Sequence, residues 1–185
     1  MKALLKSHVL LLLVLIMLTA CSSQNVQDKS YAASTTSITL KTRDADLTNS
    51  LKKNEGASVA GKDDSTLFES IIADDKITIP YVKIGEVISI NFQDISTDQY
   101  ELYDYILNED GTIKYTSLAT ETVTLQIDKN VGTFTLNESL SSKFSSDTKD
   151  YEPGGLLRGF LLIAQQGDKQ QEYAFVIKSD ANKTE

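Results

Sequence analysis

The chain has 185 residues, with 18 lysines and arginines against 26 aspartates and glutamates, and a formal net charge of −8. This acidic balance argues against binding of nucleic acid and against an electrostatic hold on anionic lipid head groups, because both require clustered positive side chains. The sequence contains one histidine, His8, one cysteine, Cys21, and no tryptophan.

The first twenty residues have the features of an export signal. Lys2 and Lys6 precede an unbroken apolar run, residues 9–18, and these are the charged and hydrophobic regions of a secretory signal peptide. The run is too short for a transmembrane helix, which needs about 20 apolar residues. The simplest interpretation is an ordinary cleavable signal with a chance cysteine after it.

The end of the apolar run favours a more specific interpretation. Leu18-Thr19-Ala20-Cys21 resembles the lipobox of bacterial lipoproteins. The resemblance implies cleavage before Cys21, a diacylglyceryl thioether on its sulfur, and an acyl chain such as palmitate on the new amine. Two or more acyl chains give stable anchoring. We therefore expect a lipoprotein on the extracytoplasmic face of a cell membrane, in a host with one membrane or two.

Removal of residues 1–20 would reduce the set of side chains that are available for catalysis or metal binding. It leaves 16 basic against 26 acidic residues, a formal charge of −10, removes His8, and commits the thiol of Cys21 to the lipid. Ser-His-Asp or Cys-His catalysis, His or Cys zinc sites, thiol redox exchange and internal disulfides are then excluded. Carboxylate chemistry, a Ser-Lys pair and hard-cation binding stay open. We expect no enzyme activity and no cofactor, with Ca²⁺ as an open alternative.

Residues 21–64 are predicted to form a flexible tether. This stretch is rich in Ser, Thr, Asn, Asp and Lys, and its only aromatic residue is Tyr31, so it can bury little surface on folding. Ile38 and Leu40 alternate with polar residues inside residues 36–42, and this short segment could instead add an edge strand.

A folded domain is expected over residues 65–185. Its first segment, residues 65–75, has Thr66 and Glu69 at the spacing of a capping box, which favours a short helix, although a strand stays open. From residue 77 onward the apolar residues recur with the period of two that is typical of half-buried strands. The strand predictions are residues 77–92, 100–107, 111–118, 122–127, 133–136, 156–165 and 172–178.

These seven predicted strands indicate an all-β, antiparallel β-sandwich with an immunoglobulin-like topology. A small closed β-barrel is the alternative. Asp110-Gly111 is a hairpin turn signal. The segment 156–165 is apolar on both faces, which predicts a central strand. Residues 137–155 are the longest irregular stretch, and we expect them to cross from one sheet to the other, with a functional loop as the other possibility.

Three groups of residues are candidate sites. Loop carboxylates can bind Ca²⁺, and Asp94, Asp98 and Asp110, close to Asp104 and Glu109, stand at predicted strand ends, although Asp110 also suits a turn. A platform for a sugar or a peptide could be formed by tyrosines, which have a flat apolar face and a polar tip. Its members would be Tyr100, Tyr103, Tyr105 and Tyr115.

The third candidate is Arg158, which has the same strand parity as Phe160 and Leu162. A buried guanidinium needs a carboxylate partner, and Asp150 or Glu152 is close in sequence. We expect a structural pair that ties the crossing segment to the sheet, rather than an anion site.

Together these patterns favour a lipid-anchored envelope protein whose β-sandwich is a binding or interaction module for an unknown envelope protein or glycan. One alternative is an accessory or structural subunit of a surface complex, which would expose an apolar patch or an open sheet edge. Another is a carboxylate-based or Ca²⁺-dependent enzyme, which would need a cleft holding two or more carboxylates of raised pKa.

Overall fold

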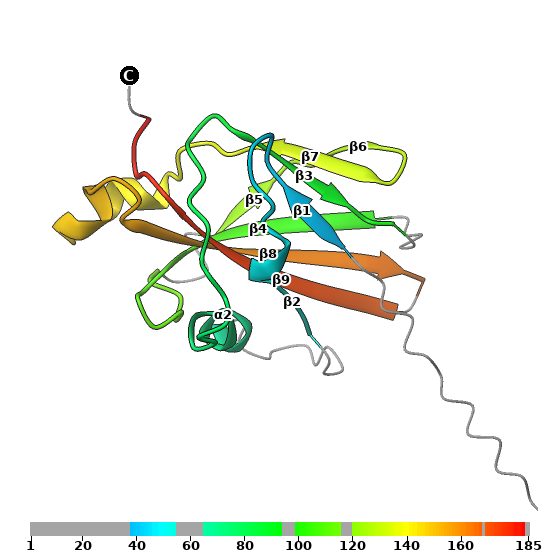
Figure 1. The fold of residues 1–185 in the computed structure, drawn as a ribbon, viewed down its shortest axis with the longest axis horizontal. Helices are drawn as coiled ribbons and strands as arrows, with labels where there is room; N and C mark the ends of the chain where they lie inside the picture. The colour runs from blue at the N-terminus through cyan, green and yellow to red at the C-terminus, as the bar shows by residue number, and fades with distance from the viewer. Residues whose placement is uncertain (1–37, 55–64, 94–98, 116–119, 168, 184–185) are drawn as a thin grey trace, which may run out of the picture. The chain divides into compact units, whose positions relative to one another are not determined.

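Two antiparallel sheets make up most of the chain that the computed structural model describes, namely residues 38–54, 65–93, 99–115, 120–167 and 169–183 (Figure 1). The four-stranded sheet has the order β1 (Thr39–Lys41), β3 (Val87–Asn91), β7 (Val131–Thr135), β6 (Gln126–Asp128). The five-stranded sheet has the order β2 (Leu51–Lys53), β9 (Lys169–Ser179), β8 (Leu156–Gln166), β4 (Gln99–Leu107), β5 (Glu121–Val123). The other described elements are α2 (Ser65–Ile72) and the 3₁₀ helices η1 (Thr48–Ser50), η3 (Ser141–Phe144) and η4 (Thr148–Tyr151).

The core lies between the two sheets. Ile88 and Ile90 of β3 meet Phe160 of β8 and Phe175 of β9 in one fully buried cluster, in which the rings of Phe160 and Phe175 stack with centroids 4.8 Å apart. Each such side chain stabilises the fold by about 1.5–3 kcal/mol through burial. The expected antiparallel sandwich is confirmed, and the described strands form two open sheets rather than the small closed barrel considered as an alternative.

Helix α2 covers the outer face of the five-stranded sheet, as the ribbon in Figure 1 shows. Phe68 and Ile71 are fully buried against it. The ring of Phe68 lies directly over Gly159, where a Cβ atom would stand 2.9 Å from the Phe68 Cδ1 atom. The helix prediction for this segment is confirmed over residues 65–72, and the strand alternative is wrong.

The hairpin β8–β9 dominates the five-stranded sheet. Its eleven paired positions run from Leu156 opposite Ser179 to Gln166 opposite Lys169, and β8 is the middle strand, as its two apolar faces predicted. The segment 137–155 connects β7 of one sheet to β8 of the other, so the predicted crossing is confirmed.

Both edges of the sandwich are formed by chain segments that change sheets. At one edge β1 ends the four-stranded sheet, the chain turns through η1, and β2 ends the five-stranded sheet. At the other edge β5 and β6 follow one another with only Thr124 and Leu125 between them, yet they belong to different sheets. The predicted single strand 122–127 is therefore wrong, and Ile127, which has the same strand parity as Val123 and Leu125, is 45% exposed.

The predicted tether is wrong for residues 38–54. Ile38, Leu40 and Leu47 are buried in the core, and β1 and β2 pair with β3 and β9. The edge strand considered for residues 36–42 is confirmed as β1. A few apolar residues in a polar stretch are enough because each of them lies in the core. Residues 21–37 and 55–64, with Cys21, lie outside the described part of the chain.

Two further strand predictions differ from the structure. Of residues 77–92 only Val87–Asn91 are a strand, because the chain turns at Gly85, whose φ is +92°. Of the predicted strand 111–118, residues 111–115 form only an isolated bridge at Ile113, so this part of the prediction is wrong, and residues 116–118 lie outside the described part of the chain. The turn predicted at Asp110-Gly111 is present, since the Gly111 N–H donates to the Asn108 carbonyl at 3.0 Å.

Among the described residues, no helix is long and apolar enough to cross a membrane.

Candidate functional site

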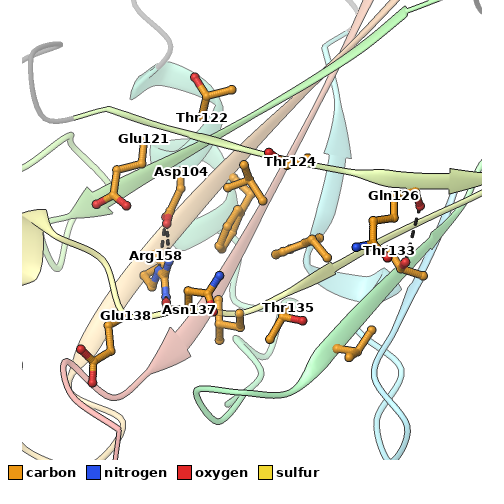
Figure 2. Close-up of a pocket in the computed structure, with 15 residues that line it drawn as sticks. Asp104, Glu121, Thr122, Thr124, Gln126, Thr133, Thr135, Asn137, Glu138 and Arg158 are labelled. Atoms are coloured by element: carbon orange, nitrogen blue, oxygen red, sulfur yellow. Dashed lines mark hydrogen bonds and ion pairs between the residues drawn. The ribbon is translucent and has the colours of Figure 1, made fainter.

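A slot opens where the two strands of one hairpin separate. In β6 and β7 the register places Gln126 opposite Thr133, and the same register continued would place Val123 opposite Leu136. Instead Val123 pairs with Leu102 of β4. The two arms of the hairpin, residues 121–125 and 134–138, therefore diverge, and a cavity of about 400 Å³ lies between them (Figure 2). We call this cavity the slot.

Threonines line the slot on both of its sides. Thr122 and Thr124 come from one side and Thr133 and Thr135 from the other, as Figure 2 shows. Apolar surface comes from Phe134, Leu136 and Phe160, which are themselves buried. The slot thus has small, β-branched, hydroxyl-bearing walls over an apolar interior.

A buried ion pair closes the inner end of the slot. The side chains of Asp104 and Arg158 are 2% and 3% exposed, Arg158 Nε donates to Asp104 Oδ1 at 3.2 Å, and Nη2 contacts Oδ2. Arg158 Nη1 donates to the backbone carbonyl of Asn137 at 2.6 Å, and the guanidinium carbon lies 5.4 Å from the centre of the Phe160 ring.

The expected partners of Arg158 were wrong, although its expected role was right. Asp150 bonds instead to Lys114, with 2.6 Å between Oδ2 and Nζ, and Glu152, the residue that follows η4, is not a partner of Arg158 in any described bond. The register places Arg158 opposite Ile106 of β4, so Asp104 is its diagonal neighbour on the same face. Through Asn137, the first residue of the crossing segment, Arg158 still ties that segment to the sheet.

Burial raises the pKa of the Asp104 carboxyl, because its charged form loses water, while the Arg158 guanidinium opposes this rise and Glu121 adds to it. Glu121 is directly opposite Asp104 on β5. The charged form of Asp104 therefore depends on Arg158.

Glu121 and Glu138 make the loop end of the slot acidic. Glu121 Oε1 accepts hydrogen bonds from Ser139 Oγ at 2.6 Å and from the Ser141 N–H at 3.2 Å. The Lys183 backbone N–H donates to Glu138 at 2.8 Å and lowers the pKa of that carboxyl, with a smaller effect from Lys143. The slot has three carboxylates and one guanidinium among its lining residues.

The structure separates the four predicted platform tyrosines. Tyr100 points into the sandwich and stacks on Phe92, with ring centroids 4.0 Å apart, whereas Tyr105 is 8% exposed on the opposite face, against Phe68 of α2. Tyr103 shares that outer face and donates to Glu101 at 2.7 Å. Tyr115 packs beside Ile106. The platform prediction is therefore wrong.

Of the Ca²⁺ candidates, only Asp110 lies in the described part of the chain, and Asp94 and Asp98 lie outside it. Asp110 accepts hydrogen bonds from the N–H and hydroxyl of Thr112, at 2.9 and 2.6 Å, which is the turn role considered for it. Within the described ranges no three His, Cys, Asp or Glu side chains are grouped closely enough to hold a metal ion.

Comparisons with known proteins add little to this geometry. No protein-family model and no curated protein sequence matches the chain. Among solved structures, the chain is similar to the extended catalytic domain of H. jecorina LPMO9A, also called EG4, with 14% sequence identity and a TM-score of 0.30. The match covers 58% of this chain and 50% of that one. Similarity at this level is no basis for assigning an activity.

Proposed function

We propose that this chain is a bacterial lipoprotein, anchored through acyl chains on Cys21 to the extracytoplasmic face of a cell membrane, whose β-sandwich is a binding module. The lipobox-like segment Leu18-Thr19-Ala20-Cys21 is the basis for the anchor. The slot between the splayed arms is the basis for binding, and it is the observation that carries the proposal. The ligand is a component of the cell envelope, either a protein or a glycan.

We further propose that the sandwich is immunoglobulin-like. In that topology one sheet has the strand order A-B-E-D and the other has G-F-C, extended by C′ in variable-type domains. The order β1-β3-β7-β6 matches the first, and β9-β8-β4-β5 matches the second. The crossing from β7 to β8 corresponds to the connection between strands E and F. The chain departs from antibody domains in having one cysteine and no tryptophan.

The slot suits binding better than hydrolysis. The two carboxylates that face each other across β4 and β5 are both engaged, Asp104 by Arg158 and Glu121 by Ser139. A general acid and base need carboxyls that are free to exchange a proton with the substrate. We therefore place no catalytic step at this site.

An accessory subunit of a surface complex is the second candidate, and the crossing segment favours it. Leu140, Phe144 and Tyr151 are 63%, 79% and 45% exposed, and all three belong to the segment that connects the two sheets. Exposed apolar side chains gathered on one segment are typical of protein interfaces.

Lipidation is tested by metabolic labelling with an alkyne fatty acid in a bacterial host. The natural chain should be labelled and recovered with membranes. The Cys21→Ser variant should remain unlabelled and keep the signal peptide, residues 1–20. A natural chain that is exported without label would overturn the anchor.

Binding is tested by retention of envelope components on the immobilised full chain. Thr124→Trp fills the slot with a large ring, and Thr39→Trp makes the same change on β1, at the opposite edge of the four-stranded sheet. We expect a retained component to be lost with Thr124→Trp and kept with Thr39→Trp. Equal retention by all three proteins would show that the slot is not the binding site.

A further inference from the structure

We propose that the slot accepts an extended peptide segment, which adds a strand beside β7 and forms main-chain hydrogen bonds with residues 135 and 137. This inference rests on the proposed function, because it takes the slot to be the binding site, and it specifies the chemical class of the ligand. The occupant lies between the two arms shown in Figure 2.

The first step of the argument is the direction of the backbone groups of β7. Neighbouring residues of a strand direct their N–H and C=O groups to opposite sides. Leu136 uses both of its groups on the β3 side, where its N–H donates to Glu86 and its carbonyl accepts from Gly85, each at 2.8 Å. Thr135, the last residue of β7, therefore directs its backbone groups away from β3 and toward the slot. The same alternation, continued past the end of β7, does so for Asn137.

The second step is that the neighbouring strand has departed. Thr133 still has Gln126 of β6 opposite it, but beyond this pair β5 has left to join β4. The next arm residues, from 134 onward, thus have a partner strand only on the β3 side. The slot is a sheet edge that has been opened between two strands of the same chain, and such an edge is a template for a further strand.

The third step is the bond that Arg158 makes. Its Nη1 donates to the Asn137 carbonyl at 2.6 Å. Arg158, which lies inside the sandwich, thus provides the hydrogen bond that this carbonyl would otherwise receive from a neighbouring strand. Among the backbone hydrogen bonds of the described residues, none outside the strand ladders uses the N–H or C=O of Thr135 or the N–H of Asn137, so these groups are left to the occupant. Arg158 also fixes the position of the arm, since Asp104 holds the same guanidinium.

The lining residues indicate what the peptide contains. The threonines at 122, 124 and 135 favour small or β-branched side chains, because these pair well across strands. Glu121 and Glu138 at the loop end favour a lysine or arginine there. Five residues of extended chain, about 17 Å at 3.3 Å per residue, match the length of the arm 134–138.

The experiment selects ligands from a phage-displayed library of random decapeptides on the immobilised full chain in detergent, with counter-selection on Thr124→Trp. We expect enriched peptides that are rich in Val, Ile and Thr and carry Lys or Arg. Selected peptides are then synthesised with and without N-methyl groups at alternate residues, which remove main-chain donors and leave side chains intact. N-methylation in the pairing frame should weaken binding about tenfold or more, and in the other frame much less.

A protein variant tests the same hydrogen bond from the other side. Thr135→Pro removes the N–H that faces the slot without touching the bonds of Leu136 to Glu86 and Gly85. It should keep a native far-UV circular dichroism spectrum and lose peptide binding, whereas Thr39→Trp should bind normally. If Thr135→Pro fails to fold, the N-methylated peptides alone decide the question.

The outcomes separate this inference from the proposed function. Peptides that are blocked by Thr124→Trp but bind equally well when N-methylated in either frame would overturn strand pairing and leave the slot as the binding site. Failure to enrich any peptide that discriminates against Thr124→Trp would also overturn the inference. In that case the retention of envelope components, compared between Thr124→Trp and Thr39→Trp, decides the proposed function separately.

Discussion

Removing the carboxylate of the buried ion pair is expected to be among the most damaging single changes to this domain. Asp104→Ala leaves the Arg158 guanidinium 3% exposed, with its bond to the Asn137 carbonyl but no counter-ion. Breaking a buried pair from one side costs about 3–5 kcal/mol, a large share of the roughly 5–15 kcal/mol by which domains are usually stable. The crossing segment should loosen as well, since Arg158 positions its first residue.

The complementary change has a different pH dependence. In Arg158→Met the buried Asp104 loses the group that opposed its raised pKa. A carboxyl whose pKa is higher in the folded than in the unfolded state takes up a proton on folding, so stability falls as the pH rises between the two values. The loss of stability should therefore be smaller at pH 4 than at pH 7. Asp104→Ala should show no such relief, because a guanidinium does not titrate there.

Urea unfolding, followed by circular dichroism and tyrosine fluorescence, measures these free energies. The double variant Asp104→Leu/Arg158→Met should lose less stability than either single variant, because it leaves no unpaired buried charge. A loss under about 1 kcal/mol for Asp104→Ala, or single effects that simply add in the double variant, would refute the view that the two side chains form one buried unit.

Three further outcomes are expected. Gly159→Ala should lower stability by about 1–3 kcal/mol in urea unfolding, because its Cβ would meet the Phe68 ring at 2.9 Å; an unchanged midpoint would show that α2 can shift at no cost. The hydrogen bond to Asp180 raises the pKa of Tyr81 to about 12, and burial raises the pKa of Tyr100 as well. Titration at 295 nm should therefore show late tyrosines, of which the Tyr81 component alone moves toward 10 in Asp180→Asn. The stabilisation that comes from the Tyr81–Asp180 hydrogen bond is fully present below pH 10 and is lost as the pH rises through 12. Phe144→Ser should change stability by less than about 0.5 kcal/mol, because Phe144 is 79% exposed; a larger loss would place this side chain in the fold.

The period of two in the sequence predicts which strand residues face the core better than it predicts which residues form the slot. Tyr173, Phe175 and Ile177 alternate with the other residues of the predicted strand 172–178, and all three are buried on the core side of β9. The same parity rule separates Tyr100 from Tyr103 and Tyr105, so the error in the tyrosine platform could have been avoided from the sequence. The outer face of β9, with Ala174 and Val176, is buried because α2 covers it. The period of two within a strand carries no information about a helix that packs on the outside of the sheet.

The slot itself has no signal in the sequence. Alternation of polar and apolar residues continues unbroken through residues 122–127, although the chain passes from one sheet to the other within them, since a change of partner strand leaves the side-chain period intact. The partner of Arg158 was missed for a related reason. Sequence distance favoured Asp150, whereas the register of β4 and β8 brought Asp104 from 54 positions away.

The pairing of β2 with β9 also determines when the domain can fold. Leu51, near the start of the described chain, lies opposite Phe175, and the Asn54 side chain bonds to Glu172, 118 positions later. Closing so long a loop is slow, because the entropy is lost before the contact forms. A chain that emerges with its N-terminus first cannot place β2, or seat α2 against Val176, until β9 has followed. These two elements therefore stay undocked until the C-terminal strand is available.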